Sequence, residues 1–217
     1  MSVPIQKLTE FFGAFPGIGP RQAKRFVYHL LKQDHETLDS FVNTLRQLKD
    51  DTVQCPDCFR YFSAGGHKKD GDCCDICRDI NVDDSLLMIV EKDVDLETIR
   101  RSGVYGGRFF VLGGLVPILE KNPSLLVRSK ELFNKILNTC QPPVNKSAET
   151  QKLTEVIIAL SANPDGDNTV DYLRPILKPL EDKFGFKVTI LGRGLSTGTE
   201  IEYSDRDTLA NALKNRN

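Results

Sequence analysis

Two Cys-x-x-Cys pairs place the strongest constraint on how this chain can fold. Cys55 and Cys58 form the first pair, Cys74 and Cys77 form the second, and 15 residues separate them. Each pair can turn two thiolates toward one ion, and two pairs complete the tetrahedral shell of a structural zinc site. The segment between them is rich in glycine and lysine and too polar to bury a core of its own. The sequence therefore predicts one structural Zn²⁺ per chain, held by these four cysteines.

The ligand set can be chosen in more than one way. Cys73 would pair with Cys77 at a spacing of three residues, and we rank Cys74 above it because Cys74 completes a second Cys-x-x-Cys pair. Asp57 and His67 are further potential ligands that four thiolates make unnecessary. Redox disulfides, or reduced cysteines packed in a core, are the alternatives to a metal. Four cysteine ligands leave no position for a reacting water, so the expected zinc is structural.

The stretch FPGIGPRQAKRF, residues 15–26, predicts a phosphate-binding hairpin. Apolar residues recur at helical spacing on both sides of it, and glycines and prolines interrupt the two helices. Glycines let backbone N–H groups approach a phosphate, and basic side chains on the next helix can reach its neighbours. Such contacts hold a duplex or a single strand without reading its sequence. The candidate DNA contacts are Gly17, Gly19, Arg21, Lys24 and Arg25.

The local charge favours this interpretation over a plain helix-turn-helix with a solvated basic face. The whole chain has a net charge of −1 and shows no overall basic signature. Residues 1–33, however, carry five lysines and arginines against one glutamate, a balance of +4. Tyr28 and Lys32 share the basic face of the second helix with the three cations of the hairpin. Glycine positions, helix phase and charge agree, so we favour phosphate binding.

Beyond the cysteines, short apolar strands alternate with helices. The predicted strands cover 85–91, 109–112, 156–160 and 186–191, and the predicted helices cover 93–101, 124–137, 168–182 and 206 to the end. This alternation is typical of βαβ units and a parallel sheet. The chain starts with no apolar signal sequence, and no apolar run approaches the roughly 20 residues of a membrane span. We therefore expect a cytoplasmic protein with reduced thiols and no membrane partner.

These motifs, in this order, resemble the RecR family of bacterial recombination mediators. The matching blocks cover nearly the whole chain: FPGIGPRQAKRFVYHLL, the four cysteines ending in CDIC, LMIVEKDVDLETIRRSGVYGGRFFVLGGL, TEVIIALSANPDGDNTVDYL and GRGLSTGTEIEYSDRDTLANAL. The resemblance implies a multidomain α/β fold. Its expected parts are a helix-hairpin-helix DNA-binding module at 1–54, a four-cysteine zinc motif at 55–80, a Toprim domain at 81–191 and a C-terminal helical assembly segment at 192–217.

The resemblance also implies a function in recombinational DNA repair and no enzymatic activity. Family members form homo-oligomers, dimers that pair into a tetrameric clamp around single- or double-stranded DNA. With RecO or RecF they help to load RecA at single-stranded gaps, in the cytoplasm at the nucleoid. The DNA-contacting basic residues of the family fall on Arg21 and Arg25 here.

Two departures from the family pattern concern the Toprim part. Asn163-Pro164 runs straight into Asp165-Gly166-Asp167, two residues shorter than the usual N-P-x-x-E-G-E stretch. The usual D-G-I-G-P stretch is replaced by LEKNPSLLVRSKELF. We therefore expect partner contacts in these regions to differ from those of other members.

The acidic residues near these departures raise an alternative function, a Mg²⁺-dependent Toprim nuclease acting on DNA. Glu91, Asp165 and Asp167 are expected at the C-terminal ends of strands, where Toprim enzymes hold Mg²⁺ and where α/β sheets build their sites. Helix capping by the two aspartates is a purely structural alternative. We favour a binding scaffold in which the three carboxylates dock a basic partner protein and any Mg²⁺ has no catalytic role.

Overall fold

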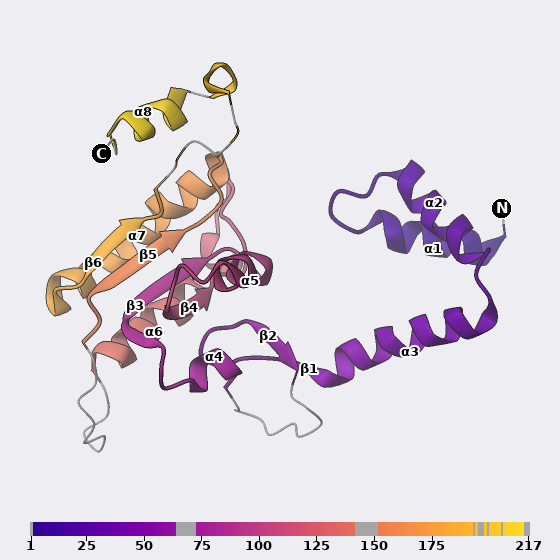
Figure 1. Cartoon of the computed structure of the whole chain (residues 1–217), viewed down its shortest axis with the longest axis horizontal. Helices are drawn as coiled ribbons and strands as arrows, with labels where there is room; N and C mark the ends of the chain where they lie inside the picture. Colours follow the sequence, from indigo (N-terminus) through magenta and orange to yellow (C-terminus); the bar gives the residue numbers. More distant parts are fainter. Residues whose placement is uncertain are drawn as a thin grey trace. The chain divides into compact units, whose positions relative to one another are not determined.

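The computed structural model describes residues 2–63, 73–141, 152–192, 194, 198, 200–204 and 206–214. This part of the chain divides into two compact units, the first formed by residues up to Val53 together with Ser63, and the second by the other residues from Gln54 onward. Figure 1 colours the chain from its N-terminal helices to the C-terminal helix α8 (Arg206–Lys214). The α/β fold class expected from the sequence is confirmed.

The first unit consists of three helices. They are α1 (Val3–Gly13), α2 (Pro20–Leu30) and α3 (His35–Asp51). The ring of Phe12 in α1 meets the edge of Phe26 in α2, with 5.6 Å between centroids, and Ala23 and Val27 of α2 are buried. No residue of α3 is buried, so this unit leaves much apolar surface uncovered.

The second unit is built on a four-stranded parallel sheet (Figure 1). Its strands are β3 (Asp83–Val90), β4 (Gly107–Val111), β5 (Glu155–Ala159) and β6 (Lys187–Ile190), and they lie side by side in the order β4-β3-β5-β6. The connecting helices are α5 (Asp93–Ser102), α6 (Ser129–Cys140) and α7 (Pro164–Phe184). Because the chain winds outward from the two central strands, the switch point of the sheet lies between the C-terminal ends of β3 and β5.

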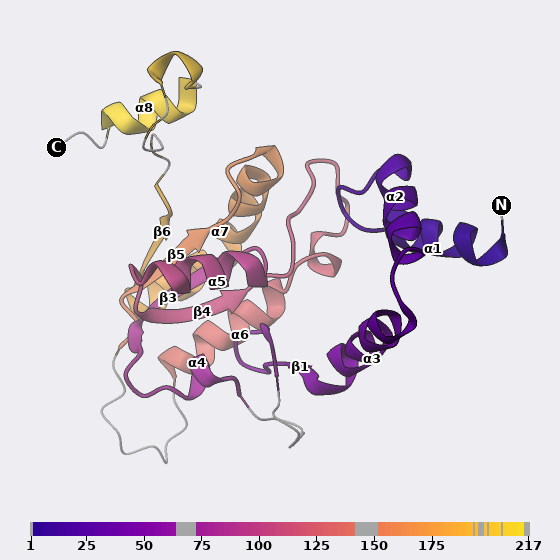
Figure 2. The same ribbon diagram turned by 45° about the vertical axis from the view of Figure 1, so that its right-hand side comes forward.

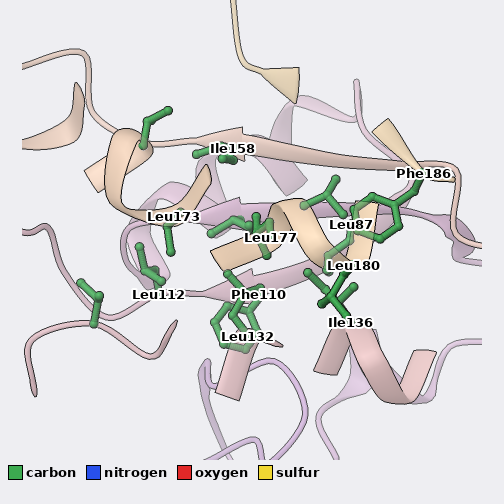
Figure 3. Close-up of a cluster of buried hydrophobic side chains, with 14 of the residues drawn as sticks. Leu87, Phe110, Leu112, Leu132, Ile136, Ile158, Leu173, Leu177, Leu180 and Phe186 are labelled. Atoms are coloured by element: carbon green, nitrogen blue, oxygen red, sulfur yellow. The ribbon is translucent and has the colours of Figure 1, made fainter. Parts of the chain in front are cut away.

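Alternate strand residues supply two separate cores, one on each face of the sheet. On one face, Leu87 and Phe110 pack with Leu132 of α6 and Leu177 of α7, as Figure 3 shows. The opposite face packs against α5 and the cysteines; its buried members include Met88, Val90, Leu96, Phe109, Cys55, Cys58 and Cys74. Figure 2 shows α5 and α6 on opposite sides of the sheet. Since both faces are covered, the strands appear in the sequence as continuous apolar runs.

Short elements complete the described chain. β1 (Thr52–Gln54) pairs with β2 (Tyr61–Ser63), α4 (Asp75–Arg78) begins directly after Cys74, and 3₁₀ turns lie at Pro123–Leu125 and Ile201–Tyr203. None of the described helices combines the length and apolar character needed to cross a membrane.

The two outer strands, β4 and β6, each have a backbone N–H group that points away from the sheet and is already hydrogen bonded. The Val111 N–H of β4 donates to the Cys58 carbonyl at 2.8 Å. The Val188 N–H of β6 donates to the Glu181 carboxylate of α7 at 3.1 Å. Lys178 Nζ lies 3.0 Å from that carboxylate, and its hydrogen bond lowers the pKa of Glu181. The cysteine segment therefore borders the sheet at β4, and the Glu181 side chain borders the sheet at β6.

Two helices differ from their expected limits. α7 begins at Pro164 rather than at 168, because the Asn163 side chain caps it by accepting a hydrogen bond from the Gly166 N–H at 2.8 Å. The helix expected over 124–137 divides into a 3₁₀ turn and α6. The Arg128 N–H donates to the Leu112 carbonyl at 3.0 Å, which ties the chain to the end of β4 before α6 starts.

Gly166→Ala is expected to destabilise the second unit. Gly166 is buried in the first turn of α7, and a Cβ there would collide with the carbonyl oxygen of Ser161, a backbone atom that cannot simply turn away. We expect a loss of about 1–3 kcal/mol in the free energy of unfolding, measured by urea denaturation. Gly106→Ala is the control, since a Cβ there meets nothing within 4 Å. Equal stability of the two variants would contradict the close contact between Gly166 and the Ser161 carbonyl.

Candidate metal centre and nucleic-acid interface

The structure brings four thiols together in the second unit. The sulfur atoms of Cys55, Cys58, Cys74 and Cys77 all lie within 4.8 Å of one another, and those of Cys58 and Cys74 are 3.6 Å apart. The first three are buried, and Cys77 is partly exposed. The described cysteines are all free of disulfides.

The spacing and the chemistry of these thiols fit a metal ion. A tetrahedral ion with metal–sulfur bonds of about 2.3 Å would place its sulfurs about 3.8 Å apart, close to the observed spacing. Hydrogen bonds with Cys58 and Cys74 lower the pKa of Cys55, whereas the hydrogen bond with Cys55 raises the pKa of Cys77. Four adjacent thiols cannot all become thiolates unless a cation lies among them. The residues present therefore form a four-cysteine metal-binding cluster.

The other candidate ligands considered from the sequence do not join this group in the described structure. Cys73 is half-buried beside the cluster, and burial raises its pKa. Asp57 forms an ion pair with Lys135, with 2.7 Å between the carboxylate and Nζ. His67 lies outside the described residues.

Phe59 connects the metal-binding cluster to the sheet. It follows Cys58 directly and has a φ of 63°, a left-handed conformation that a bulky residue rarely adopts. Its ring packs edge-on against Phe110 of β4, with 5.4 Å between centroids, and the Arg128 guanidinium lies 5.4 Å from the ring centroid. Neither Phe59 nor Arg128 was singled out from the sequence, because their roles depend on contacts between distant segments.

Ion pairs anchor the second cysteine pair to α5. Asp75, at the start of α4, lies 3.0 Å from the Arg60 guanidinium and 2.9 Å from that of Arg100. Burial favours the neutral form of Asp75, but the two guanidinium groups outweigh it and lower its pKa. The metal-binding segment is therefore tied to the sheet by backbone, aromatic and ionic contacts.

In the first unit, the turn between α1 and α2 is open. Gly17 has a φ of 76°, a conformation that glycine adopts without strain, and Gly19 is the N-cap of α2. A Cβ at either glycine would meet nothing within 4 Å, and no side chain caps the helix. Pro20 has no N–H, but the N–H groups of Arg21 and Gln22 in the first turn of α2 have no partner within the helix, so they can bind an anion.

The basic side chains on α2 are exposed beside this turn. Arg21, Lys24 and Arg25 are all exposed, and α2 itself contains no acidic residue. Among the described residues, none of the three forms an ion pair; Arg25 makes one long hydrogen bond of 3.5 Å to Gln22. The structure therefore places the five candidate DNA contacts in one accessible region.

The three acidic residues considered as Mg²⁺ ligands do not come close enough together to hold a metal ion. Glu91 follows β3, and its carboxylate accepts hydrogen bonds from Ser161 Oγ at 2.5 Å and from Lys92 Nζ at 3.1 Å. Asp165 and Asp167 lie in the first turn of α7, where negative charge favours the helix. Within the described chain, the four cysteines are the only group of three or more potential ligands close enough to hold an ion.

Ser161 was not anticipated from the sequence, although its place just after a buried strand was an available signal. Its bond to Glu91 joins the ends of β5 and β3, at the switch point where α/β sheets usually bind ligands. The carboxylate that a Toprim enzyme would offer to Mg²⁺ is engaged by the protein itself.

Both units of the chain match families of known proteins. Residues 5–49 match the family model "RecR, helix-hairpin-helix", residues 85–192 match "Toprim domain" and residues 194–217 match "RecR, C-terminal". Three proteins named "Recombination protein RecR", from Mycobacterium bovis (strain BCG / Pasteur 1173P2), Mycobacterium leprae (strain TN) and Mycobacterium tuberculosis (strain ATCC 25618 / H37Rv), are each 34% identical over 214 residues. Each match covers 98% of this chain and 96% of the relative.

Cys74→Ser is expected to remove bound metal and to lower the temperature of unfolding, because a ligand set of three thiols holds the ion less tightly. Cys73→Ser is the matched control, and we expect it to keep one metal ion per chain. Elemental analysis of the purified proteins and thermal unfolding would measure both effects. Full metal content in Cys74→Ser would contradict this ligand assignment.

Proposed function

Because this chain belongs to the RecR family and has a role in recombinational DNA repair, we propose that it acts by binding DNA through its first unit, without catalysing a reaction. In this proposal it is a recombination mediator that helps to load RecA at single-stranded gaps, together with RecO- or RecF-like proteins, at the nucleoid in the cytoplasm. The open turn at Gly17 and Gly19, beside the exposed cations of α2, is the observation that carries the proposal.

The proposed DNA contact is made to phosphates. Backbone N–H groups at the start of α2 would bind one phosphate, and Arg21 and Arg25, one helical turn apart, would bind its neighbours. Lys24 would add charge from the side. Contacts of this kind carry no sequence information, so single- and double-stranded DNA are both expected ligands.

One hairpin supplies only a few phosphate contacts, so a single copy should bind DNA weakly at physiological salt. Linking several copies raises the effective concentration of the remaining hairpins once the first has bound. We therefore propose that the protein works as a homo-oligomer, a dimer or tetramer that encloses DNA. The C-terminal segment, which includes α8, is one proposed contact between copies.

Uncovered apolar surface on the first unit supports this oligomer. Phe41, Val42, Leu45 and Leu48 of α3 are between 43% and 60% exposed, although they form the apolar stripe of an amphipathic helix. A 280 Å³ apolar hollow lies beside this stripe; it is lined by Phe12, Phe15, Phe26, His29, Leu30 and Phe41. A surface of this kind normally packs against protein, and we propose a second copy of the chain as its partner.

The second unit is proposed as a docking platform rather than an enzyme. Glu91, Asp165 and Asp167 could meet a basic surface of a RecO- or RecF-like protein. A Mg²⁺-dependent nuclease is not favoured, since the Glu91 carboxylate already has two partners and the acidic residues do not cluster. The metal in the four-cysteine cluster is proposed to be Zn²⁺, with a structural role, because four thiolates complete its preferred shell.

Arg25→Gln is expected to weaken DNA binding and to change its dependence on salt. Loss of one phosphate contact should reduce the slope of log K against log salt concentration by about 0.9 for duplex DNA and about 0.7 for a single strand. Arg25→Glu should remove most binding, while metal content and thermal unfolding stay unchanged. Fluorescence anisotropy with labelled oligonucleotides at several salt concentrations would measure these slopes.

Arg101→Gln is the control for this experiment. Its side chain is 83% exposed on α5, in the second unit, and it is not one of the proposed DNA contacts, so we expect an unchanged slope. The labelled DNA should also remain intact after incubation with the protein and Mg²⁺. Unchanged binding by Arg25→Glu would overturn the proposal, and cleavage that disappears in Glu91→Gln would favour the nuclease.

Leu45→Asp is expected to reduce the oligomeric mass. The substitution places a charge in the middle of the apolar stripe on α3, where burial against a second copy would leave that charge unpaired. Light scattering coupled to size exclusion would measure the mass. Gln47→Asp adds the same charge about 200° around the helix and should leave the mass unchanged. A Leu45→Asp protein with the mass of the wild type would exclude this interface.

A further inference from the structure

An exposed aromatic ring lies among the cations of α2. Tyr28 is 50% exposed, near the end of a helix whose other aromatic side chain, Phe26, packs against α1. In the described part of the chain, the Tyr28 ring contacts no other aromatic ring and its hydroxyl makes no hydrogen bond. Aromatic packing and hydrogen bonding within the described part of the unit therefore do not account for its position.

The position of Tyr28 follows from helical geometry. With 3.6 residues per turn, Lys24 and Arg25 lie one turn before it and Arg21 lies two turns before it on the same face. Lys32 follows four residues later, in the exposed turn that continues the helix. The ring is thus surrounded by cations on a helix that contains no carboxylate.

This combination selects the kind of ligand. Four cations attract an anion and repel an identical surface on a second copy of the chain. An exposed ring adds affinity for a ligand that offers a flat apolar face of its own. An unpaired base on a phosphate backbone offers both features, and base–aromatic stacking tolerates every base. In a duplex the base faces are already stacked and out of reach.

We propose that Tyr28 is a base-stacking residue that favours single-stranded over duplex DNA. This inference rests on the proposed phosphate contacts and adds a preference to them. Tyr28 lies eight residues beyond Pro20, about 12 Å along the helix axis. A stacked strand spans that distance in three to four nucleotides, at about 3.4 Å each. The hairpin holds the backbone, and the ring holds a base a few nucleotides away.

The test compares Tyr28→Leu with Tyr28→Phe on three labelled probes. The probes are an oligothymidine strand, an abasic strand of the same length and charge, and a duplex. Tyr28→Leu should bind oligothymidine about 5- to 150-fold more weakly, with an unchanged salt slope because no charge is lost. Its affinities for the abasic strand and the duplex should match the wild type. Tyr28→Phe keeps the aromatic face and should behave as the wild type on all three.

The outcomes separate this inference from the proposed function. If Tyr28→Leu binds all three probes as the wild type does, or loses affinity equally for all three, stacking is excluded while phosphate binding stands. A change in oligomeric mass in Tyr28→Leu would assign the ring to a subunit contact and would also overturn the inference. If the wild type binds none of the probes, both the proposed function and the inference on Tyr28 fail.

Discussion

Burial of the parallel sheet on both faces is the constraint on which the second unit depends. Helices α6 and α7 cover one face, whereas α5 alone is too small for the other, and the cysteine segment completes that cover with Cys55, Cys58 and Cys74 in the same core as Met88 and Phe109. The metal-binding cluster is therefore part of the core of this unit. Metal binding and folding of the sheet should be energetically linked, because the four thiols come together only in the folded unit and can all ionise there only around a cation.

The first unit has the opposite character. Its small core consists of the buried Ala23 and Val27 beside the edge-on contact of Phe12 with Phe26, and it exposes cations on α2 and an apolar stripe on α3. Neither surface serves an isolated chain: a few phosphate contacts bind weakly, and apolar side chains in water contribute nothing to stability. Both become useful when copies associate around a nucleic acid, which is the mode of action proposed for this member of the RecR family.

The parts of the molecule specified by local signals could be predicted from the sequence. The cysteine spacing indicated the cluster, and alternating apolar runs indicated the α/β fold. The missed features depend on contacts between distant segments. The left-handed backbone of Phe59 is tolerated because its ring packs on Phe110, and Ser161 reaches Glu91 because β3 and β5 are neighbours in the sheet. The early start of α7 is marked by a local signal, the capping residue Asn163 followed by Pro164, which an analysis of apolar periodicity does not detect.

The hydrogen bonds at the two outer strands have a consequence for crowded assemblies. An unprotected sheet edge is a template on which another chain can add a strand, and high local concentration makes such pairing an aggregation hazard. Here the Cys58 carbonyl occupies an outward donor of β4, and the Glu181 carboxylate occupies one of β6. A copy that added a strand at either border would have to displace one of these hydrogen bonds, which disfavours growth of the sheet from one crowded copy to the next.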